Sequence, residues 1–232
     1  MEKNTNNKEN IMFNPTPDDE VQITRKMYGF NCYFGIVKKK KLSLLDKIKK
    51  FLKITDEWID YKYIYGICKT DDFYDSKLNH NDEFLEFVEN KYDIRNKLWD
   101  SVKGLSKNYI QDGFTIYGTI YGKDIHSSYN YNLDTIEFVG TSIFEHKNYV
   151  APDAVKFIFD TILDLPHVEI LHTGEWNKDI QDNYLYKNYV GNTNETIPHA
   201  GLIIRHVSGD PEKVRTIYNP EFMIFIGKND FM

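Results

Sequence analysis

Cysteine is scarce in this sequence. The 232 residues include two cysteines, Cys32 and Cys68, and no Cys-x-x-Cys pair. Two cysteines cannot form a disulfide framework, and neither they nor the histidines have the spacing of zinc ligands. The sequence therefore excludes a disulfide-stapled fold and identifies no metal ligands. Low cysteine use fits a reducing compartment, so we expect a soluble, cytoplasmic protein.

Long apolar runs are also missing. No apolar segment approaches the roughly 20 residues that a membrane-spanning helix needs. Residues 1–14 are polar and rich in Asn and Lys, without the apolar centre of a signal peptide. We therefore expect a disordered polar tail over residues 1–14 and no membrane partner.

The chain has no excess of positive charge. Its net charge is −6 and its pI is about 5.7, so a nucleic-acid site would have to be a local basic patch. Residues 38–41 are four lysines, and apolar residues at helical spacing follow them. They are Leu44, Leu45, Ile48, Phe51 and Leu52. We expect an amphipathic helix over residues 42–54, whose lysines either contact phosphates or an anionic surface, or simply face water.

Aromatic residues make up 15% of the chain, which is long enough for a packed core. Period-two patterns predict strands at residues 21–24, 31–37, 61–68, 114–121, 135–144, 168–171, 201–207 and 214–218. Helical periodicity marks residues 82–105 and 152–163, and residues 175–188 in part. This irregular order indicates an α+β fold with largely antiparallel sheets. We expect a single domain over residues 15–232, with the first two strands paired as a hairpin.

One residue at the end of the first strand is a candidate for covalent chemistry. Lys26 follows that strand directly, and Gly29 comes three residues later, where a tight turn is expected. A lysine in such a place can act as an amine nucleophile, provided that burial or nearby positive charge lowers its pKa. Taken alone, the same pattern also describes a surface lysine before a turn.

Three stretches, in order, resemble the ATP-dependent RNA ligases, a family of covalent nucleotidyltransferases. The first, Lys26-Met-Tyr-Gly-Phe-Asn, is similar to the family's nucleotidyl-lysine motif. The second, Tyr117-Gly-Thr-Ile-Tyr-Gly, is similar to its Tyr-Gly-Glu segment. The third, Ala200-Gly-Leu-Ile-Ile-Arg, is similar to a strand that begins Glu-Gly and ends in Arg. With weaker matches, the resemblance covers about residues 21–222.

The resemblance implies the nucleotidyltransferase (ATP-grasp-like) domain of RNA and DNA ligases, with antiparallel sheets and flanking helices. It also implies ATP and Mg as cofactors and RNA ends as partners. Lys26 would take AMP from ATP as a lysyl-AMP intermediate and pass it to an RNA 5′-phosphate, which a 3′-hydroxyl then attacks. The family's C-terminal RNA-binding extension is expected to be absent.

Carried over residue by residue, the resemblance assigns nucleotide binding to Gly29, Asn31, Lys69, Phe138, Arg205 and Arg215. Phe138 would stack on adenine, and Arg205 would contact phosphate or RNA. In place of the missing extension, Lys38, Lys49 and Lys50 are candidates for RNA or phosphate contacts.

The chain departs from the family where carboxylates are expected. Thr119, Gly140 and Ala200 occupy positions that are acidic in the family, and Tyr28 stands where it has an acid or a histidine. Magnesium binds through carboxylate oxygens and water, so a magnesium site is doubtful. Two hypotheses stay open: a divergent ligase, or a catalytically degenerate pseudo-ligase that binds nucleotide or RNA. A third is an interaction protein that keeps only the scaffold.

Overall fold

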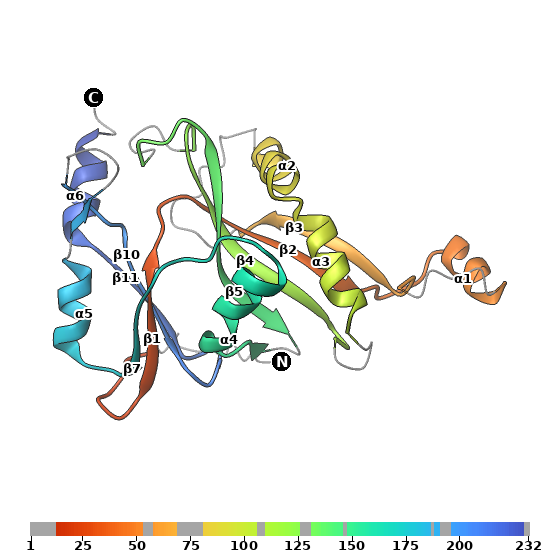
Figure 1. The fold of residues 1–232 in the computed structure, drawn as a ribbon, viewed down its shortest axis with the longest axis horizontal. Coiled ribbons are helices and arrows are strands. Elements are labelled where there is room, and N and C mark those ends of the chain that lie inside the picture. The colour runs from red at the N-terminus through yellow and green to blue at the C-terminus, as the bar shows by residue number, and fades with distance from the viewer. Residues whose placement is uncertain are drawn as a thin grey trace, which may run out of the picture.

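Two antiparallel sheets form the frame of the molecule (Figure 1). The computed structural model describes residues 13–52, 58–68, 81–105, 110–125, 131–145, 148–186, 188–190 and 196–229. Most of the expected tail, residues 1–12, lies outside these ranges. The first sheet, which we call sheet A, has the strand order β11-β10-β1-β7. Its strands are β1 (Glu20–Lys26), β7 (Ile170–Glu175), β10 (Gly201–His206) and β11 (Val214–Tyr218).

The second sheet, sheet B, has the order β3-β2-β4-β5-β6. Its strands are β2 (Phe30–Lys38), β3 (Tyr61–Ile67), β4 (Gly113–Gly122), β5 (Ile136–Glu145) and β6 (Asn148–Tyr149). A two-stranded ribbon pairs β8 (Asn188–Val190) with β9 (Thr196–Pro198). The expected α+β class and antiparallel sheets are confirmed.

Helices cover the sheets and connect them. They are α1 (Leu44–Phe51), α2 (Asn81–Tyr92), α3 (Ile94–Lys103), α4 (Pro152–Phe157), α5 (Lys178–Leu185) and α6 (Pro220–Asn229). A π-helical turn, η1 (Ile158–Ile162), continues α4. The helix expected over residues 82–105 is broken at Asp93, whose backbone is left-handed with φ of 52°. Among the described residues, no helix is long and apolar enough to cross a membrane.

The larger core lies between sheet B and helices α2 and α3. Alternate residues of β2 and β4, such as Phe34 and Ile116, point to this side and are fully buried. They pack with Leu98 of α3 and its neighbours, because each sheet buries one face and each helix one stripe. A smaller core joins sheet A to α5 through Val21, Ile23 and other apolar residues.

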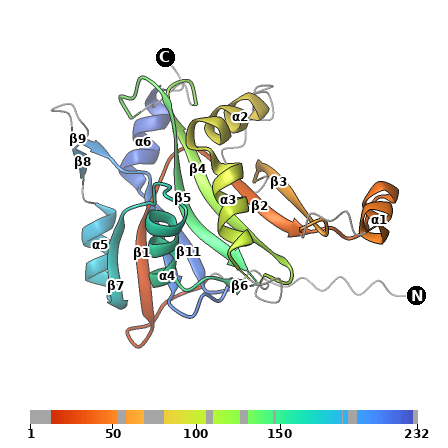
Figure 2. The ribbon, with the colours of Figure 1, turned by 45° about the vertical axis from the view of Figure 1, so that its right-hand side comes forward.

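The expected hairpin between the first two strands is wrong. β1 pairs with β10 and β7 in sheet A, whereas β2 pairs with β3 and β4 in sheet B. The short segment after Lys26 therefore carries the chain from one sheet to the other (Figure 2). The same turn residues can fold the chain back into a hairpin or lead it into another sheet. Local sequence does not distinguish these two outcomes.

The burial of His167 should make the stability of the fold depend on pH. Its ring packs against Phe159, and the backbone beside it bridges to Gly140. Burial lowers the pKa of His167 to about 4. The charges of Lys156 and Arg205 lower the pKa further, and the charge of Asp160 raises it. The unfolded chain, with an ordinary pKa of 6.5, binds the proton more readily. Stability is therefore lost as pH falls from about 6.5 towards 4, by about 3 kcal/mol from this group.

Chemical unfolding at pH 7 and at pH 4 measures this effect. The variant His167→Gln is expected to lose about 3 kcal/mol less than the wild type over that interval. His172→Gln, which removes a partly exposed histidine of β7, serves as the control and should keep the wild-type dependence. Equal pH dependence of wild type and His167→Gln would contradict the prediction.

Candidate functional site

The passage between the two sheets depends on a glycine. A Cβ atom on Gly29 would lie 2.2 Å from the carbonyl oxygen of Ile120 and 2.9 Å from Cγ2 of Thr119, both on β4. No side chain fits at such distances, so only glycine lets the segment after β1 press against β4. This contact places the end of β1 beside the start of β2.

Lys26 is the last residue of β1 and is buried, with 8% of its surface exposed. In the register of sheet A it lies opposite Gly201 of β10. Gly201 has a φ of +151°, and a Cβ there would lie 2.1 Å from the carbonyl oxygen of Ile217. Lys26 is thus buried, as a lysine that acts as an amine nucleophile is expected to be.

Strand alternation divides β1 into two faces. Val21 and Ile23 point to α5 and form the apolar outer face of sheet A. Gln22, Thr24 and Lys26 share the other face, which we call the inner face, and all three are buried. Arg205 lies directly opposite Gln22 in the register, so it shares the inner face with Lys26. The two are separated by four strand positions, or about 13 Å.

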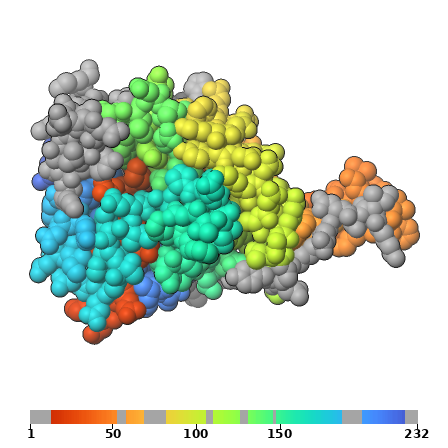
Figure 3. All heavy atoms as spheres, viewed as in Figure 1, coloured from red at the N-terminus to blue at the C-terminus, as the bar shows by residue number. Residues whose placement is uncertain are grey.

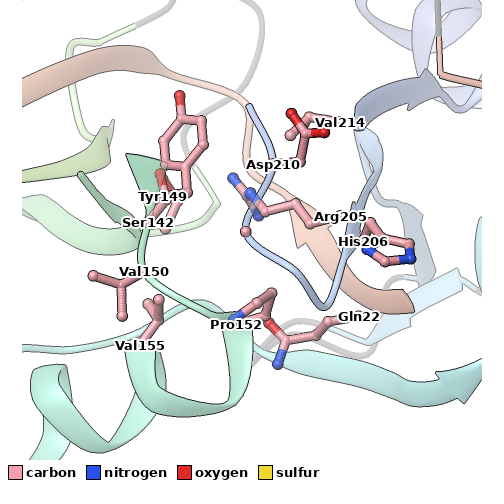
Figure 4. Close-up of a pocket in the computed structure, with 12 residues that line it drawn as sticks. Gln22, Ser142, Tyr149, Val150, Pro152, Val155, Arg205, His206, Asp210 and Val214 are labelled. Atoms are coloured by element: carbon pink, nitrogen blue, oxygen red, sulfur yellow. The ribbon is translucent and has the colours of Figure 1, made fainter. Parts of the chain in front are cut away.

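A pocket on this inner face is bounded by both sheets (Figure 4). We call it the inter-sheet pocket; its volume is about 10 Å³, roughly the room of one water molecule. Gln22, Arg205 and Val214 line it from sheet A, and Ser142 and Tyr149 from sheet B. In Figure 4 the guanidinium of Arg205 extends from β10 into the space beside Tyr149.

The Arg205 guanidinium is largely buried. Burial lowers its pKa to about 10, which leaves it charged at neutral pH. Nη1 donates a long hydrogen bond of 3.4 Å to Oγ1 of Thr24, and Nε has no partner among the described residues. A buried donor without a partner costs about 1–3 kcal/mol, and more on a charged group.

The inner face of sheet B is also polar. Oγ1 of Thr119 on β4 donates a 3.0 Å hydrogen bond to Oδ1 of Asn31, which lies opposite it on β2. Two strand positions further on, Tyr33 and Tyr117 lie opposite each other, and Tyr117 also contacts Tyr149 at 6.2 Å between ring centres. Burial, with Tyr149 nearby, raises the pKa of Tyr117. Polar and aromatic groups therefore separate two sheets whose outer faces are apolar.

The family model for RNA ligases matches residues 19–217, which include both sheets and the inter-sheet pocket. The chain belongs to the RNA ligase family. No curated protein matches the sequence.

Solved structures of Naegleria gruberi RNA ligase have a similar fold. A point mutant with ATP and Mn aligns with a TM-score of 0.55 at 14% identity, over 92% of this chain and 52% of that one. A structure with PPi gives the same values, and a mutant with AMP and Mn gives 0.54 at 14% identity over 93% and 53%. The chain thus spans about half the length of these ligases, and the nucleotidyltransferase fold expected from the sequence is confirmed.

Of the nucleotide contacts predicted for this RNA ligase domain, Arg205 lines the pocket, whereas Phe138 and Arg215 point away from the inner faces. Phe138 pairs with Ile120, is fully buried on the helix side of sheet B and packs against Phe34. Arg215 pairs with Ile204 on the outer face of sheet A, where its Nη1 donates to Oδ1 of Asn14 at 2.7 Å. These placements correct both expectations, because alternation directs each side chain away from the inner faces.

The other predicted contacts are spread over the molecule. Gly29 and Asn31 lie at the passage between the sheets, and Lys69 lies outside the described residues. Lys38 is the last residue of β2 and pairs with Tyr61 in sheet B, whereas Lys49 and Lys50 lie on α1, which stands apart from both sheets (Figure 1). There, Nζ of Lys50 binds the carboxylate of Asp60 at 3.0 Å. RNA contacts by these lysines stay a prediction, separate from the pocket.

At positions 119, 140 and 200, where carboxylates were expected, the residues present make close contacts with their neighbours. A Cβ on Gly140 would lie 2.0 Å from the Phe159 ring, so no acidic side chain fits there. Ala200 is buried in a small apolar cluster with Tyr28 and Phe222. Thr119 is 1% exposed and bound to Asn31. Among the described residues, no group of three or more His, Cys, Asp or Glu could hold a metal.

Sequence reasoning missed several residues of the inner face and of the pocket. Gln22 and Thr24 share the inner face with Lys26, and the polar alternation of β1 could have identified them. Tyr149 and Asp210 come from β6 and from the loop before β11. Nothing in the local pattern around these two residues indicates that they meet Arg205, because the fold alone brings these segments together.

Substitution of Gly29 tests whether its close contact with β4 holds the site together. Gly29→Ala is expected to lower the free energy of unfolding by about 3 kcal/mol or more, because the new methyl group would overlap a backbone carbonyl. Gly104→Ala is the matched control, since a Cβ there has its nearest neighbour at 3.5 Å and the backbone is helical. Its stability should be unchanged or raised by up to about 1 kcal/mol. Similar results for both variants would contradict the account.

Proposed function

We propose that this chain is an RNA-ligase-type nucleotidyltransferase that joins or adenylylates RNA ends through AMP carried on Lys26. One observation supports this most strongly. Lys26 and Arg205 are 179 positions apart in the sequence, yet the register of β1 and β10 puts them on the same buried face of sheet A. A buried amine and a buried guanidinium on one face suit a ligand with several phosphates.

The proposed chemistry has three balanced steps. Nζ of Lys26, after releasing a proton to solvent, attacks the α-phosphorus of ATP, so that a P–N bond forms, the nitrogen releases a second proton to solvent and pyrophosphate leaves. An oxygen of an RNA 5′-phosphate then attacks the same phosphorus, which breaks the P–N bond and returns the amine. Finally, a 3′-hydroxyl attacks the RNA phosphate, and AMP leaves. The Naegleria gruberi ligase structures contain ATP, AMP or PPi with the same fold, which supports ATP as the substrate here.

Arg205 would neutralise phosphate charge in this scheme. Its guanidinium is buried with one long hydrogen bond, so a phosphate oxygen would gain a strong, charge-assisted partner. Asn31 lies across the passage on β2 and is held by Thr119, where it can orient a ribose or phosphate group. Phosphoryl transfer relies mainly on such positioning and charge stabilisation.

A magnesium ion held by the protein does not fit the described residues. Ala200 and Gly140 supply no oxygen from a side chain, and Thr119 supplies only a hydroxyl that already donates to Asn31. Mg²⁺ prefers carboxylate and water oxygens. We therefore route no step through a metal bound by these residues.

A pseudo-ligase is the second candidate, and the apolar cluster beside Lys26 favours it. Tyr28 packs edge-to-face on Phe222 at 5.1 Å, with Ala200 in the same cluster. The strand position next to Ala200, Gly201, lies opposite Lys26. Apolar side chains there cannot stabilise developing charge, and the loss of one such group typically costs about a hundred- to a thousandfold in rate. The chain would then bind nucleotide or RNA ends without turnover.

Incubation with α-labelled ATP and either Mg²⁺ or Mn²⁺, followed by denaturing electrophoresis, separates the two candidates. Turnover predicts a covalent label on the wild type that is lost in Lys26→Met. Lys178→Met, which changes an exposed lysine of α5, is the matched control and should keep the label.

If the wild type is not labelled, a binding assay shows whether the protein still binds ATP or RNA ends without turnover. If ATP still binds and Arg205→Met weakens binding by about tenfold or more, the protein is a binding relic of a ligase. If ATP and RNA ends both fail to bind, or if label persists in Lys26→Met, the proposed function is wrong.

A further inference from the structure

Helix α1 has an apolar face that stays exposed in the part of the chain that the structure describes. It stands away from both sheets, beyond the ends of β2 and β3 (Figures 1 and 3). Leu44, Leu45 and Phe51 have 75%, 70% and 86% of their surface exposed, and Ile48 and Leu52 are also exposed. None of the residues of α1 is buried. An apolar surface of this kind on a polar chain marks an interaction site.

The exposed residues form one stripe. At about 100° per residue, Leu44, Leu45, Ile48, Phe51 and Leu52 fall within about 120° of the helix circumference. Lys47 and Lys49 lie on either side of that stripe, and both are exposed. Lysines in such flanking places can keep their charge in water while their methylene chains lie along an apolar phase.

The helix is held in a defined orientation. Ser43 and Asp46 form a reciprocal capping box at its start. Nζ of Lys39, which follows β2, binds the Asp46 carboxylate at 2.9 Å, and Lys50 binds Asp60, just before β3. The stripe is therefore built into the fold at both ends of the helix.

Charge indicates the kind of partner. Residues 38–52 contain seven lysines and a single acidic residue, Asp46, and so carry a net charge of +6. The whole chain carries −6, so this segment has the opposite sign to the remainder. A partner of this surface must accept an apolar stripe and supply negative charge around it.

We propose that α1 is an interfacial helix that attaches the protein to an anionic lipid bilayer. The apolar stripe would enter the boundary between headgroups and acyl chains, with the lysines at the anionic phosphates. Such attachment lies along the membrane surface and needs no spanning helix. It goes beyond the proposed function and does not depend on it.

Three other partners fit less well. RNA would use the lysines and leave the apolar stripe in water. A second copy of α1 would bring two strongly positive segments together. A protein groove over eight helical residues would bury less than the roughly 1,000 Å² that a stable interface needs. A bilayer meets both the apolar and the charged requirement without any matching groove.

Vesicle flotation of the full chain tests the proposal. Vesicles of phosphatidylcholine with about a third phosphatidylserine are expected to carry the protein, and phosphatidylcholine vesicles should carry at least about tenfold less. Leu45→Ser with Phe51→Ser should lower binding to the anionic vesicles by about tenfold or more, because it removes the stripe. Lys47→Glu with Lys49→Glu should do the same, because it reverses the flanking charge.

Phe157→Ser is the matched control. Phe157 is 59% exposed on α4, so this variant removes an exposed aromatic residue outside α1 and should bind vesicles like the wild type. Circular dichroism and thermal unfolding establish that each variant is folded. The proposal is overturned if the anionic vesicles do not bind, or if the Leu45/Phe51 variant binds them fully. It is also overturned if α1 instead binds a labelled RNA through its lysines alone, or drives self-association that Leu45→Ser and Phe51→Ser abolish.

Discussion

The contact between Gly29 and the Ile120 carbonyl is the constraint on which the site depends. The chain leaves sheet A at Lys26 and enters sheet B at Phe30, so three residues span the passage between two sheets. At 2.2 Å from a carbonyl oxygen, any side chain at position 29 would push the two strands apart. The position of Lys26 relative to Asn31 is therefore set by backbone packing, and only then by the chemistry of either side chain.

The outer faces of the two sheets are apolar, whereas their inner faces carry buried polar residues. The outer faces bury apolar residues against helices, which stabilises the fold in the usual way. The inner faces bury Gln22, Thr24, Lys26, Thr115, Thr119 and Ser142. Buried polar groups cost free energy unless they are bonded, and stability alone gives no reason to gather them between two sheets. A polar ligand there does.

Much of this arrangement could be predicted from sequence, but only along each strand. Alternation in β1 and β10 correctly marks the strands that carry Lys26 and Arg205. It did not place Arg215 on the outer face, because a shift of one residue reverses the face of a strand. In β5, apolar residues stand on both faces, so the burial of Phe138 against α2 and α3 was not visible. The assignment of β1 and β2 to different sheets is a tertiary property, which the turn does not encode.

At two positions where the sequence comparison expected carboxylates, packing explains the residue that is present. The Phe159 ring requires glycine at position 140, and Tyr28 and Phe222 enclose Ala200. Restoring a carboxylate at either place would need changes in its neighbours as well. The inner face of sheet A therefore buries the cations Lys26 and Arg205, and no carboxylate stands at positions 119, 140 and 200.

Hydrogen exchange with and without ATP is the decisive test of a nucleotide site between the sheets, because it detects binding whether or not turnover occurs. We predict that ATP slows exchange in two separate segments, residues 26–31 at the passage and residues 205–214 around Arg205. Protection should be absent in α1, which is remote from the pocket. Protection of only one of the two segments, or of the outer helices alone, would contradict a nucleotide site between the sheets.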